Sequence, residues 1–333
     1  MAKGKKKGIP FLLYLLLCMI LVGASAAGAA YIYCREKYSG DHRLYSEQAF
    51  RSLAEGSLEY RIARQFFSEE DIQRIRSADT VDNAVPFSRT VMDEDEKDPN
   101  GDGIWIEHIY APTYEGYMMV VEDPSKVFIA VNPRMGSAGP APELEDYVSL
   151  YHAAGGINGG GFEDSGGTGD GSIPAGIVIM NGELISGGAP QPIVGITRDH
   201  RLITTTCSGQ EALDMGVYEA VTFGPTFITD GRVTYVPGTD NLNMLNPRTA
   251  IGQKADGTFL LLVIDGRGPS SFGAKYEDVV AIFQEYEAVN AGNLDGGNSS
   301  VMMYDGAYVH YPVSMYDSRN LPSVILVKGD EDE

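Results

Sequence analysis

Four Asx-Gly pairs, each placed between two short apolar segments, constrain the fold of this 333-residue chain more than any other feature. The pairs are Asn181-Gly182, Asp230-Gly231, Asp256-Gly257 and Asp305-Gly306. Both residues of an Asx-Gly pair tolerate positive φ, and a two-residue turn of this kind matches the twist of antiparallel strands. The sequence therefore predicts four β-hairpins spread from about residue 176 to residue 311.

Helices are expected to be fewer than strands. Residues 143–154 and 276–288 have helical spacing, and residues 38–80 are predicted to form a helical lead-in with a helix start at Ser68. Glycine occurs 40 times, which favours turns over a helical bundle. The expected class is therefore α/β (α+β), with a mixed, mainly antiparallel sheet, hairpins and a few packed helices.

The N-terminus predicts a membrane segment. Four lysines end at Lys7, and residues 9–34 form an almost uninterrupted apolar run. Such a run crosses a bilayer as a helix, and the preceding lysines favour a cytoplasmic N-terminus. We therefore expect a transmembrane signal anchor at the cell membrane, with the rest of the chain extracytoplasmic. The alternative is a secreted protein, cleaved after residues 24–26 or 27–29.

These features divide the chain into five predicted parts. They are a cytoplasmic basic tail at 1–8, the anchor at 9–34, a helical and acidic lead-in at 35–103, the main domain at 104–328, and an acidic tail at 329–333.

Charge and cysteine content exclude several classes of function. The formal net charge is −21, from 25 Lys and Arg against 46 Asp and Glu, so no nucleic-acid partner is expected. The three cysteines do not build a disulfide framework or a thiolate metal site. Residues 98–103 match the first half of a calcium loop, but Ile109 stands at its twelfth position, so an acidic turn is favoured over Ca²⁺. Ca²⁺ at this segment stays the one alternative, and no other metal or cofactor is expected.

Two aspartates follow apolar segments that are predicted to be central strands. Asp265 follows residues 260–264, which lack alternation and therefore indicate burial on both faces, and Asp295 follows residues 289–294. A predicted helix connects the segments, so we expect neighbouring strands and two carboxylates close together at one sheet end. Cleavage of a glycosidic bond uses such a pair, although capping of turns is the alternative role for both.

A glycine-rich segment at residues 155–161 contains Asn158 and is predicted to be an ordered loop. Bare backbone N–H groups in such a loop bind phosphate or sugar oxygens. Arg248 and Arg267 are expected either to clamp a phosphate or to form surface salt bridges. For an anionic substrate we expect a local basic patch near them, and its absence would count against a phosphate.

Six sequence blocks together resemble the phosphodiester glycosidase family. They lie in one order over roughly residues 114–327, at 157–162, 174–176, 223–225, 248–252, 263–267 and 293–300. The block Asn-Leu-Asp-Gly-Gly at 293–297 is the most specific, and Asn298 stands where a further glycine is common. The resemblance implies hydrolysis of a sugar-1-phosphodiester in a cell-envelope or extracellular glycan.

The resemblance and the residue patterns together give a set of candidate site residues. Asp295 and Asp265 are the catalytic candidates. The candidates for substrate binding are Asn158, Gly159, Gly160, Arg248, Arg267, Gly296, Gly297, Ser299 and Arg319. Two alternatives remain at this stage: a non-catalytic module for glycan binding or exopolysaccharide assembly, and a calcium-dependent adhesion domain.

Overall fold

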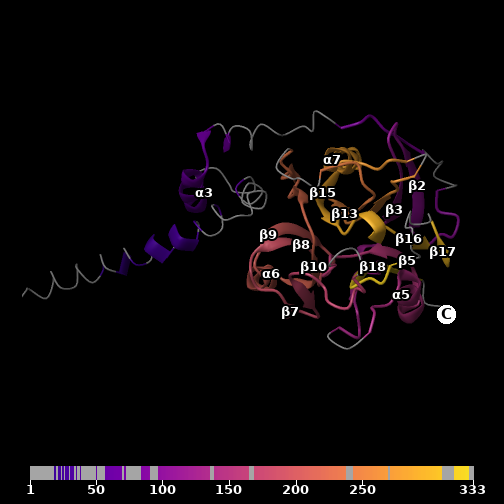
Figure 1. Cartoon of the computed structure of the whole chain (residues 1–333), viewed down its shortest axis with the longest axis horizontal. Helices are drawn as coiled ribbons and strands as arrows, with labels where there is room; N and C mark the ends of the chain where they lie inside the picture. Colours follow the sequence, from indigo (N-terminus) through magenta and orange to yellow (C-terminus); the bar gives the residue numbers. More distant parts are fainter. Residues whose placement is uncertain are drawn as a thin grey trace, which may run out of the picture.

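The computed structural model describes residues 97–329 apart from 136–138, 165–168, 238–242, 269–270 and 310–318. It also describes residues 57–69, 71–72 and 84–90, and scattered positions between 19 and 50. Within these ranges the structure consists of three antiparallel sheets with few helices (Figure 1). The antiparallel pairing and the small number of helices agree with the prediction, whereas the division into three sheets was not predicted.

The central sheet has eight strands in the order β1-β2-β3-β14-β13-β15-β11-β12. Its strands are β1 Ser88–Arg89, β2 Ile104–Tyr110, β3 Glu115–Val121, β11 Thr226–Thr229, β12 Arg232–Val233, β13 Arg248–Lys254, β14 Phe259–Ile264 and β15 Ala288–Leu294.

Two five-stranded sheets complete the domain. The first small sheet has the order β17-β16-β5-β18-β4, and the second small sheet has the order β7-β6-β10-β8-β9. The first contains β4 Val127–Val131, β5 Ala153–Asn158, β16 Met302–Tyr304, β17 Ala307–Tyr308 and β18 Ser323–Lys328. The second contains β6 Val178–Met180, β7 Glu183–Ser186, β8 Gln191–Thr197, β9 Leu202–Cys207 and β10 Val217–Thr222.

Alternating side chains place the central sheet between two hydrophobic cores. Along β14, Leu260, Leu262 and Ile264 pack with helix α7 Tyr276–Glu285. The intervening Leu261 and Val263 pack with strands of both small sheets. Successive side chains of a strand point to opposite faces, so a strand without polar alternation is buried on both. The prediction for this segment is confirmed, since all six residues of β14 are buried.

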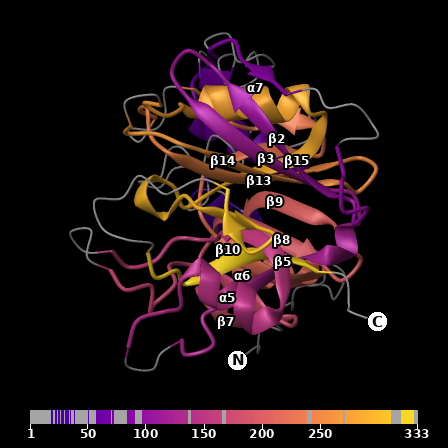
Figure 2. The same ribbon diagram turned by 90° about the vertical axis from the view of Figure 1, so that its right-hand side faces the viewer.

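Helices cover the outer layers (Figure 2), where α7 lies on one side of the sheets and α5 and α6 lie on the other. Helix α5 Leu144–Tyr151 packs against the first small sheet, and α6 Gly209–Asp214 packs against the second. The predicted helices at 143–154 and 276–288 are thus confirmed, with shorter bounds. Other short helices whose bounds lie within the described residues are α3 Leu58–Ala63, η1 Arg64–Phe66, η2 Pro124–Lys126 and η4 Gly297–Ser299.

All four predicted hairpins are present. The Asx-Gly pairs join β6 to β7, β11 to β12, β13 to β14 and β16 to β17. In three of these turns both residues have positive φ, as at Asn181 and Gly182. The local turn chemistry therefore accounts for these connections.

Two predictions about the strands are wrong. Residues 155–158 belong to strand β5 rather than to a loop, and a Cβ on Gly155 or Gly156 would overlap a backbone carbonyl oxygen of a neighbouring strand. These two glycines therefore permit close strand pairing and do not form a ligand cradle. In addition, β14 and β15 are not neighbours, because β13 pairs with both of them.

The N-terminal predictions lie mostly outside the described residues. Scattered positions between 19 and 33 are helical and exposed, but most of the predicted anchor at 9–34 is not described. In the described part of the chain, no helix combines the length and apolar character needed to span a membrane. The predicted helix start at Ser68 is confirmed, because its Oγ accepts a hydrogen bond of 3.0 Å from the backbone N–H of Asp71.

Candidate active site

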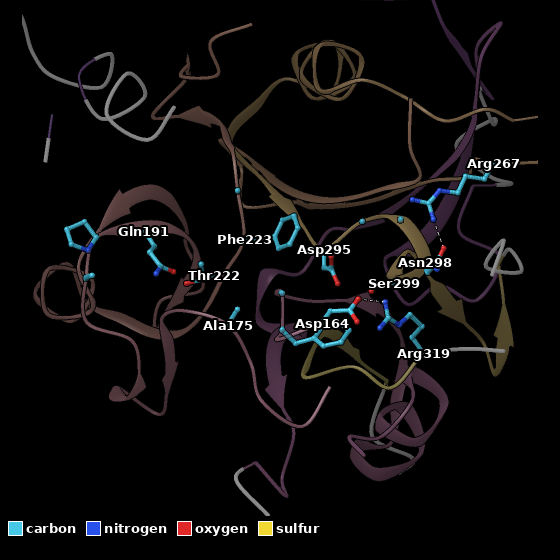
Figure 3. A pocket seen from close by; sticks show the side chains of 17 residues that line it. Asp164, Ala175, Gln191, Thr222, Phe223, Arg267, Asp295, Asn298, Ser299 and Arg319 are labelled. Atoms are coloured by element: carbon cyan, nitrogen blue, oxygen red, sulfur yellow. Dashed lines mark hydrogen bonds and ion pairs between the residues drawn. The ribbon is translucent and has the colours of Figure 1, made fainter. Parts of the chain in front are cut away.

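A cavity of about 690 Å³ lies where strand ends from all three sheets meet. It lies beyond the C-terminal ends of β15, β5 and β10, and Asp295, Gly161 and Thr222 contribute to its walls. Figure 3 shows the Asp295 carboxylate pointing into this cavity, with Asp164 and Arg319 on one side and Gln191 on the other. Since β14 and β15 both run antiparallel to β13, their C-terminal ends lie at the same edge of the central sheet.

Asn158 fixes the backbone of Asp295 from the neighbouring sheet. Its Nδ2 donates a hydrogen bond of 2.6 Å to the main-chain oxygen of Asp295. Its Oδ1 accepts bonds from the Thr249 hydroxyl at 2.7 Å and from the Val301 N–H at 3.2 Å. The Asn158 side chain is completely buried, so these internal bonds occupy it. Asn158 therefore positions Asp295 and does not line the cavity.

Gly159 and Gly160 serve close packing beside this residue. The Gly159 carbonyl accepts a hydrogen bond of 3.0 Å from the Asp295 N–H, and a Cβ on Gly159 would lie 2.7 Å from the Ser323 Oγ. The Gly160 N–H donates to that same Oγ at 2.9 Å. Both predicted ligand-binding glycines thus connect β5 to its surroundings, and the cavity wall begins at Gly161.

The environment of Asp295 favours its protonated form. Burial raises the pKa of Asp295 from 3.8 to about 6, and the negative charge of Asp164 acts in the same direction. Hydrogen bonds from Ser299 and from the Gly296 backbone, together with the charge of Arg319, oppose this rise. A carboxyl group with a pKa near 6 exchanges protons readily close to neutral pH, as a general acid or base requires.

Asp164 is the second carboxylate of the cavity, and it is absent from the sequence-based candidates. The Arg319 Nη1 lies 2.9 Å from the Asp164 Oδ2, and its Nη2 donates to the Gly169 carbonyl at 3.1 Å. The hydrogen bond from Arg319 lowers the pKa of Asp164. The Arg319 guanidinium also lies 4.8 Å from the centre of the Phe162 ring. The only sequence signal was an acidic residue shortly after the glycine-rich segment.

Arg267 lies on the same side of the cavity as Arg319 and supplies a second cation (Figure 3). Its guanidinium donates hydrogen bonds to the Asn298 Oδ1 and, at 3.0 Å, to the Asn246 Oδ1. The Arg267 backbone has a φ of 62°, in the left-handed region. Arg267 therefore occupies the predicted site, and Asn298, at the position where a glycine is common, helps to orient it.

Arg248 is not part of the cavity. Its guanidinium donates to the carbonyl oxygens of Ala274 at 3.0 Å and Met244 at 2.6 Å, and it lies 4.0 Å from the centre of the Tyr276 ring. The side chain is buried on the face of the central sheet that carries α7. Its observed contacts are those of a residue that anchors the preceding loop.

Asp265 also lies outside the cavity lining. Its Oδ1 accepts a hydrogen bond of 2.7 Å from the N–H of Gly266, which is a turn-capping role. Burial, together with the charges of Glu115 and Asp265, raises the pKa of Tyr117, which places Asp265 near β3. Because β13 separates β14 from β15, the Asp265 and Asp295 backbones lie about 10 Å apart. The structure thus pairs Asp295 with Asp164.

The loop after Asp295 forms the floor of the cavity. Gly296, Gly297 and Ser299 all line it, as predicted. Gly297 has a φ of 62°, and its N–H donates to the Pro247 carbonyl at 3.0 Å, so this N–H is already used within the protein. Glycine is favoured there, since L-residues with a side chain adopt positive φ only at a cost.

The wall opposite the arginines is neutral. It contains Phe223, Thr222 and Gln191 from the second small sheet and the segment after it. The buried Asn293 holds this wall in place, because its Nδ2 donates to the Gly224 carbonyl at 2.7 Å. The cavity therefore has one uncharged side with an aromatic ring and one charged side.

Charges in the cavity are balanced. The lining residues in the described ranges include Asp164 and Asp295 against Arg267 and Arg319. The expected basic patch around Arg248 and Arg267 is therefore not present, although this region is far less acidic than the chain as a whole.

No metal site is assembled in the described ranges, where no group of three or more His, Cys, Asp or Glu side chains is placed to hold an ion. At the calcium-like segment the Asp98 carboxylate accepts backbone hydrogen bonds from Gly101, Asp102 and Gly103 instead.

Comparison with known proteins matches the part of the chain that contains the cavity. A family model described as phosphodiester glycosidase matches residues 151–328. N-acetylglucosamine-1-phosphodiester alpha-N-acetylglucosaminidase from Mus musculus is 27% identical over 230 residues, which are 62% of this chain and 43% of the mouse protein. An uncharacterized SPbeta prophage-derived protein of Bacillus subtilis, YomE, is 33% identical over 100 residues, 29% of this chain and 16% of YomE. The chain therefore spans less than half the length of these relatives.

Structural comparison supports a shared fold. The catalytic domain of the zebrafish N-acetylglucosamine-1-phosphodiester alpha-N-acetylglucosaminidase, solved in a form auto-inhibited by its pro-peptide, aligns with a TM-score of 0.56. The sequence identity is 19%, and the alignment covers 75% of this chain and 92% of that domain. At this identity the similarity concerns the fold alone.

Proposed function

The chain belongs to the phosphodiester glycosidase family, and on that premise we propose that it hydrolyses a sugar-1-phosphodiester at the anomeric carbon. The relatives that carry an activity in their names act on N-acetylglucosamine-1-phosphodiesters, so an N-acetylglucosamine-1-phosphodiester is the first substrate to test.

One observation carries this proposal. Two carboxylates line the same cavity, and their surroundings displace their pKa values in opposite directions. Burial raises the pKa of Asp295, whereas the hydrogen bond from Arg319 lowers the pKa of Asp164. In glycosidases, one carboxyl group of such a pair transfers protons and the other stabilises the developing charge.

We assign the proton-exchanging role to Asp295. Near neutral pH its carboxylate accepts a proton from water as the water oxygen attacks the anomeric carbon. The bond between that carbon and the phosphate oxygen breaks, and its electron pair leaves with the phosphate as a phosphomonoester. Because phosphate leaves as an anion, protonation of the leaving group matters little. The ionised Asp164 stabilises the positive charge that develops on the sugar ring.

The two sides of the cavity suggest an orientation for the substrate. The phosphate lies toward Arg267, whose guanidinium is oriented by Asn246 and Asn298. The sugar lies toward Phe223 and Gln191, where an aromatic ring and an amide suit a neutral, hydroxylated ligand. The balanced charge of the cavity argues for a single phosphate contact and not for a polyanion channel.

The test is release of free sugar by the detergent-solubilised full chain. UDP-GlcNAc and an aryl phosphodiester of N-acetylglucosamine would be compared with a neutral aryl glycoside. Wild type, Asp295→Asn, Asp164→Asn, Asp265→Asn and the exposed turn variant Asp230→Asn form the panel. We expect release only from the phosphodiesters, a loss of at least 100-fold in the first two variants, and changes below threefold in the last two.

A different pattern would change the assignment. If Asp265→Asn abolishes release and Asp164→Asn does not, the roles given to these two residues are wrong. If wild type releases no sugar across the panel, yet it and Asp295→Asn bind the same glycans on an array, the chain is a non-catalytic glycan-binding module.

We also propose that the catalytic domain works outside the cytoplasm, on a cell-envelope or extracellular glycan, and is attached through residues 9–34. The apolar run and the preceding lysines support this proposal. Protease treatment of intact cells expressing the chain should degrade residues 104–328 while leaving a cytoplasmic control protein intact. Recovery of the whole chain in the soluble cytosolic fraction would contradict it.

A further inference from the structure

A second cavity, of about 420 Å³, lies where β4 meets strands β8 and β10 of the second small sheet. Strand β10 connects it to the active site, because Glu219 lines the second cavity and Thr222 lines the first. At about 3.4 Å per residue, these two positions lie roughly 10 Å apart. The lining residues described for the two cavities do not overlap, so the second cavity is a separate feature within the size range of small-molecule sites.

Glu219 presents an acceptor to this cavity. Its Oε2 accepts a hydrogen bond of 2.8 Å from the backbone N–H of Ile129, which fixes the carboxylate against the free edge of β4. Within the described part of the chain, the Oε1 atom has no hydrogen-bond partner. Burial raises the pKa of Glu219, while the Ile129 hydrogen bond and the charges of Lys328 and His200 oppose the rise.

Three basic side chains line the same cavity as this carboxylate, and the charges of two of them, Lys328 and His200, act on Glu219. Arg198 lies with its guanidinium 4.5 Å from the centre of the Tyr218 ring, and Lys328 donates to the Ser125 carbonyl at 3.0 Å. His200 completes the set from the turn after β8, where its φ is 59°. Arg198 and Lys328 give the lining two cations against one carboxylate when His200 is counted as neutral, which contrasts with the formal charge of −21 for the whole chain. Long-range attraction of anions is therefore weak, and binding depends on these local groups.

We propose that this second cavity binds an acidic sugar unit, meaning a sugar that carries a carboxylate or a phosphate. The Glu219 Oε1 accepts a hydrogen bond from a sugar hydroxyl, and Arg198 and Lys328 bind the anionic group. A simple anion does not explain the site, because the fixed carboxylate repels it. A neutral sugar leaves the cations unused. A ligand with both a hydroxyl donor and an anionic group satisfies all of these side chains.

Saturation-transfer NMR of the detergent-solubilised full chain tests the assignment. The probes are D-glucuronate, D-glucose 6-phosphate, D-glucose and inorganic phosphate, each titrated separately. The key variant is Arg198→Gln with Lys328→Gln, in which both replaced side chains are exposed. Arg201→Gln is the matched control, since Arg201 pairs with exposed Asp199 nearby but does not line the cavity. Arg267→Gln controls for binding in the active-site cavity.

We expect saturable binding of glucuronate or of glucose 6-phosphate, weakened at least tenfold in the double variant and unchanged in both controls. Which of the two binds identifies the anionic group, and Glu219→Gln should weaken the same ligand. Failure of both acidic sugars to bind, equal binding of D-glucose, or loss of binding in Arg267→Gln would overturn the proposal. Inorganic phosphate that binds as well as glucose 6-phosphate would overturn the sugar assignment. None of these results depends on hydrolysis.

Discussion

Replacing Asp295 with Asn is expected to stabilise the folded protein at neutral pH while it abolishes sugar release. In the native state, burial raises the pKa of this carboxyl from 3.8 to about 6. Between these values the unfolded chain ionises Asp295, but the folded chain retains the proton. Stability therefore falls as pH rises through this window.

The size of the effect follows from the pKa displacement. One pKa unit corresponds to 1.36 kcal/mol, so a rise from 3.8 to about 6 costs the wild type up to about 3 kcal/mol at pH 7. The amide side chain of the Asp295→Asn variant carries no charge and avoids this cost. The difference in free energy of unfolding between variant and wild type should thus be near zero at pH 3.5 and reach about 2–3 kcal/mol above pH 7.

Urea denaturation of both proteins from pH 3.5 to pH 8 measures this difference, with Asp230→Asn as the control. Asp230 is exposed in an Asx-Gly turn with a φ of 48°, where Asn fits equally well. Its stability should parallel that of wild type at every pH. A constant difference between Asp295→Asn and wild type, or one that shrinks as pH rises, would refute the reasoning that the Asp295 carboxylate is held in an unfavourable environment.

Three further predictions concern the surroundings of this residue. Ser299→Ala removes the hydrogen bond that most lowers the pKa of Asp295. The pH below which kcat/KM falls should therefore rise from about 6 by roughly 1–2 units. A pH profile of kcat/KM that does not move would exclude Asp295 as the titrating group. Arg267→Gln should raise KM for a phosphodiester about 10–100-fold while kcat changes far less, and steady-state kinetics that show an unchanged KM would contradict the phosphate contact. Asn158→Ala leaves the Thr249 hydroxyl without its buried acceptor and should lower the free energy of unfolding by about 2–4 kcal/mol; urea denaturation indistinguishable from wild type would contradict the positioning role.

Features that depend on residues adjacent in the sequence were predictable from the sequence alone. Asx-Gly turns encode positive φ locally, and all four predicted hairpins are present. The lack of polar residues alternating with apolar ones before Asp265 indicated a strand buried on both faces, and β14 is such a strand. The segment from Asp295 to Ser299 likewise places its predicted residues in the cavity, because one short loop carries them all.

Features that depend on strand order could not be predicted in this way. Strand β13 lies between β14 and β15 and therefore separates Asp265 from Asp295. Nothing in the sequence between these two aspartates specifies that β13 pairs with both strands. The alternation along β13 turns Arg248 toward α7, on the face opposite the small sheets. Asn158 is buried because β5 approaches the central sheet, where Thr249 and the Asp295 backbone use its polar atoms.

The sequence by itself determined the hairpins, the family and the carboxylate at Asp295, since each is carried by contiguous residues. The tertiary structure alone decided that Asp164 pairs with the predicted Arg319, 155 residues away in the chain, at the wall of the cavity. An ion pair between distant segments depends on how three sheets pack together. Local backbone preference constrains a turn of two residues, but it contains no information about which distant side chains a cavity brings together.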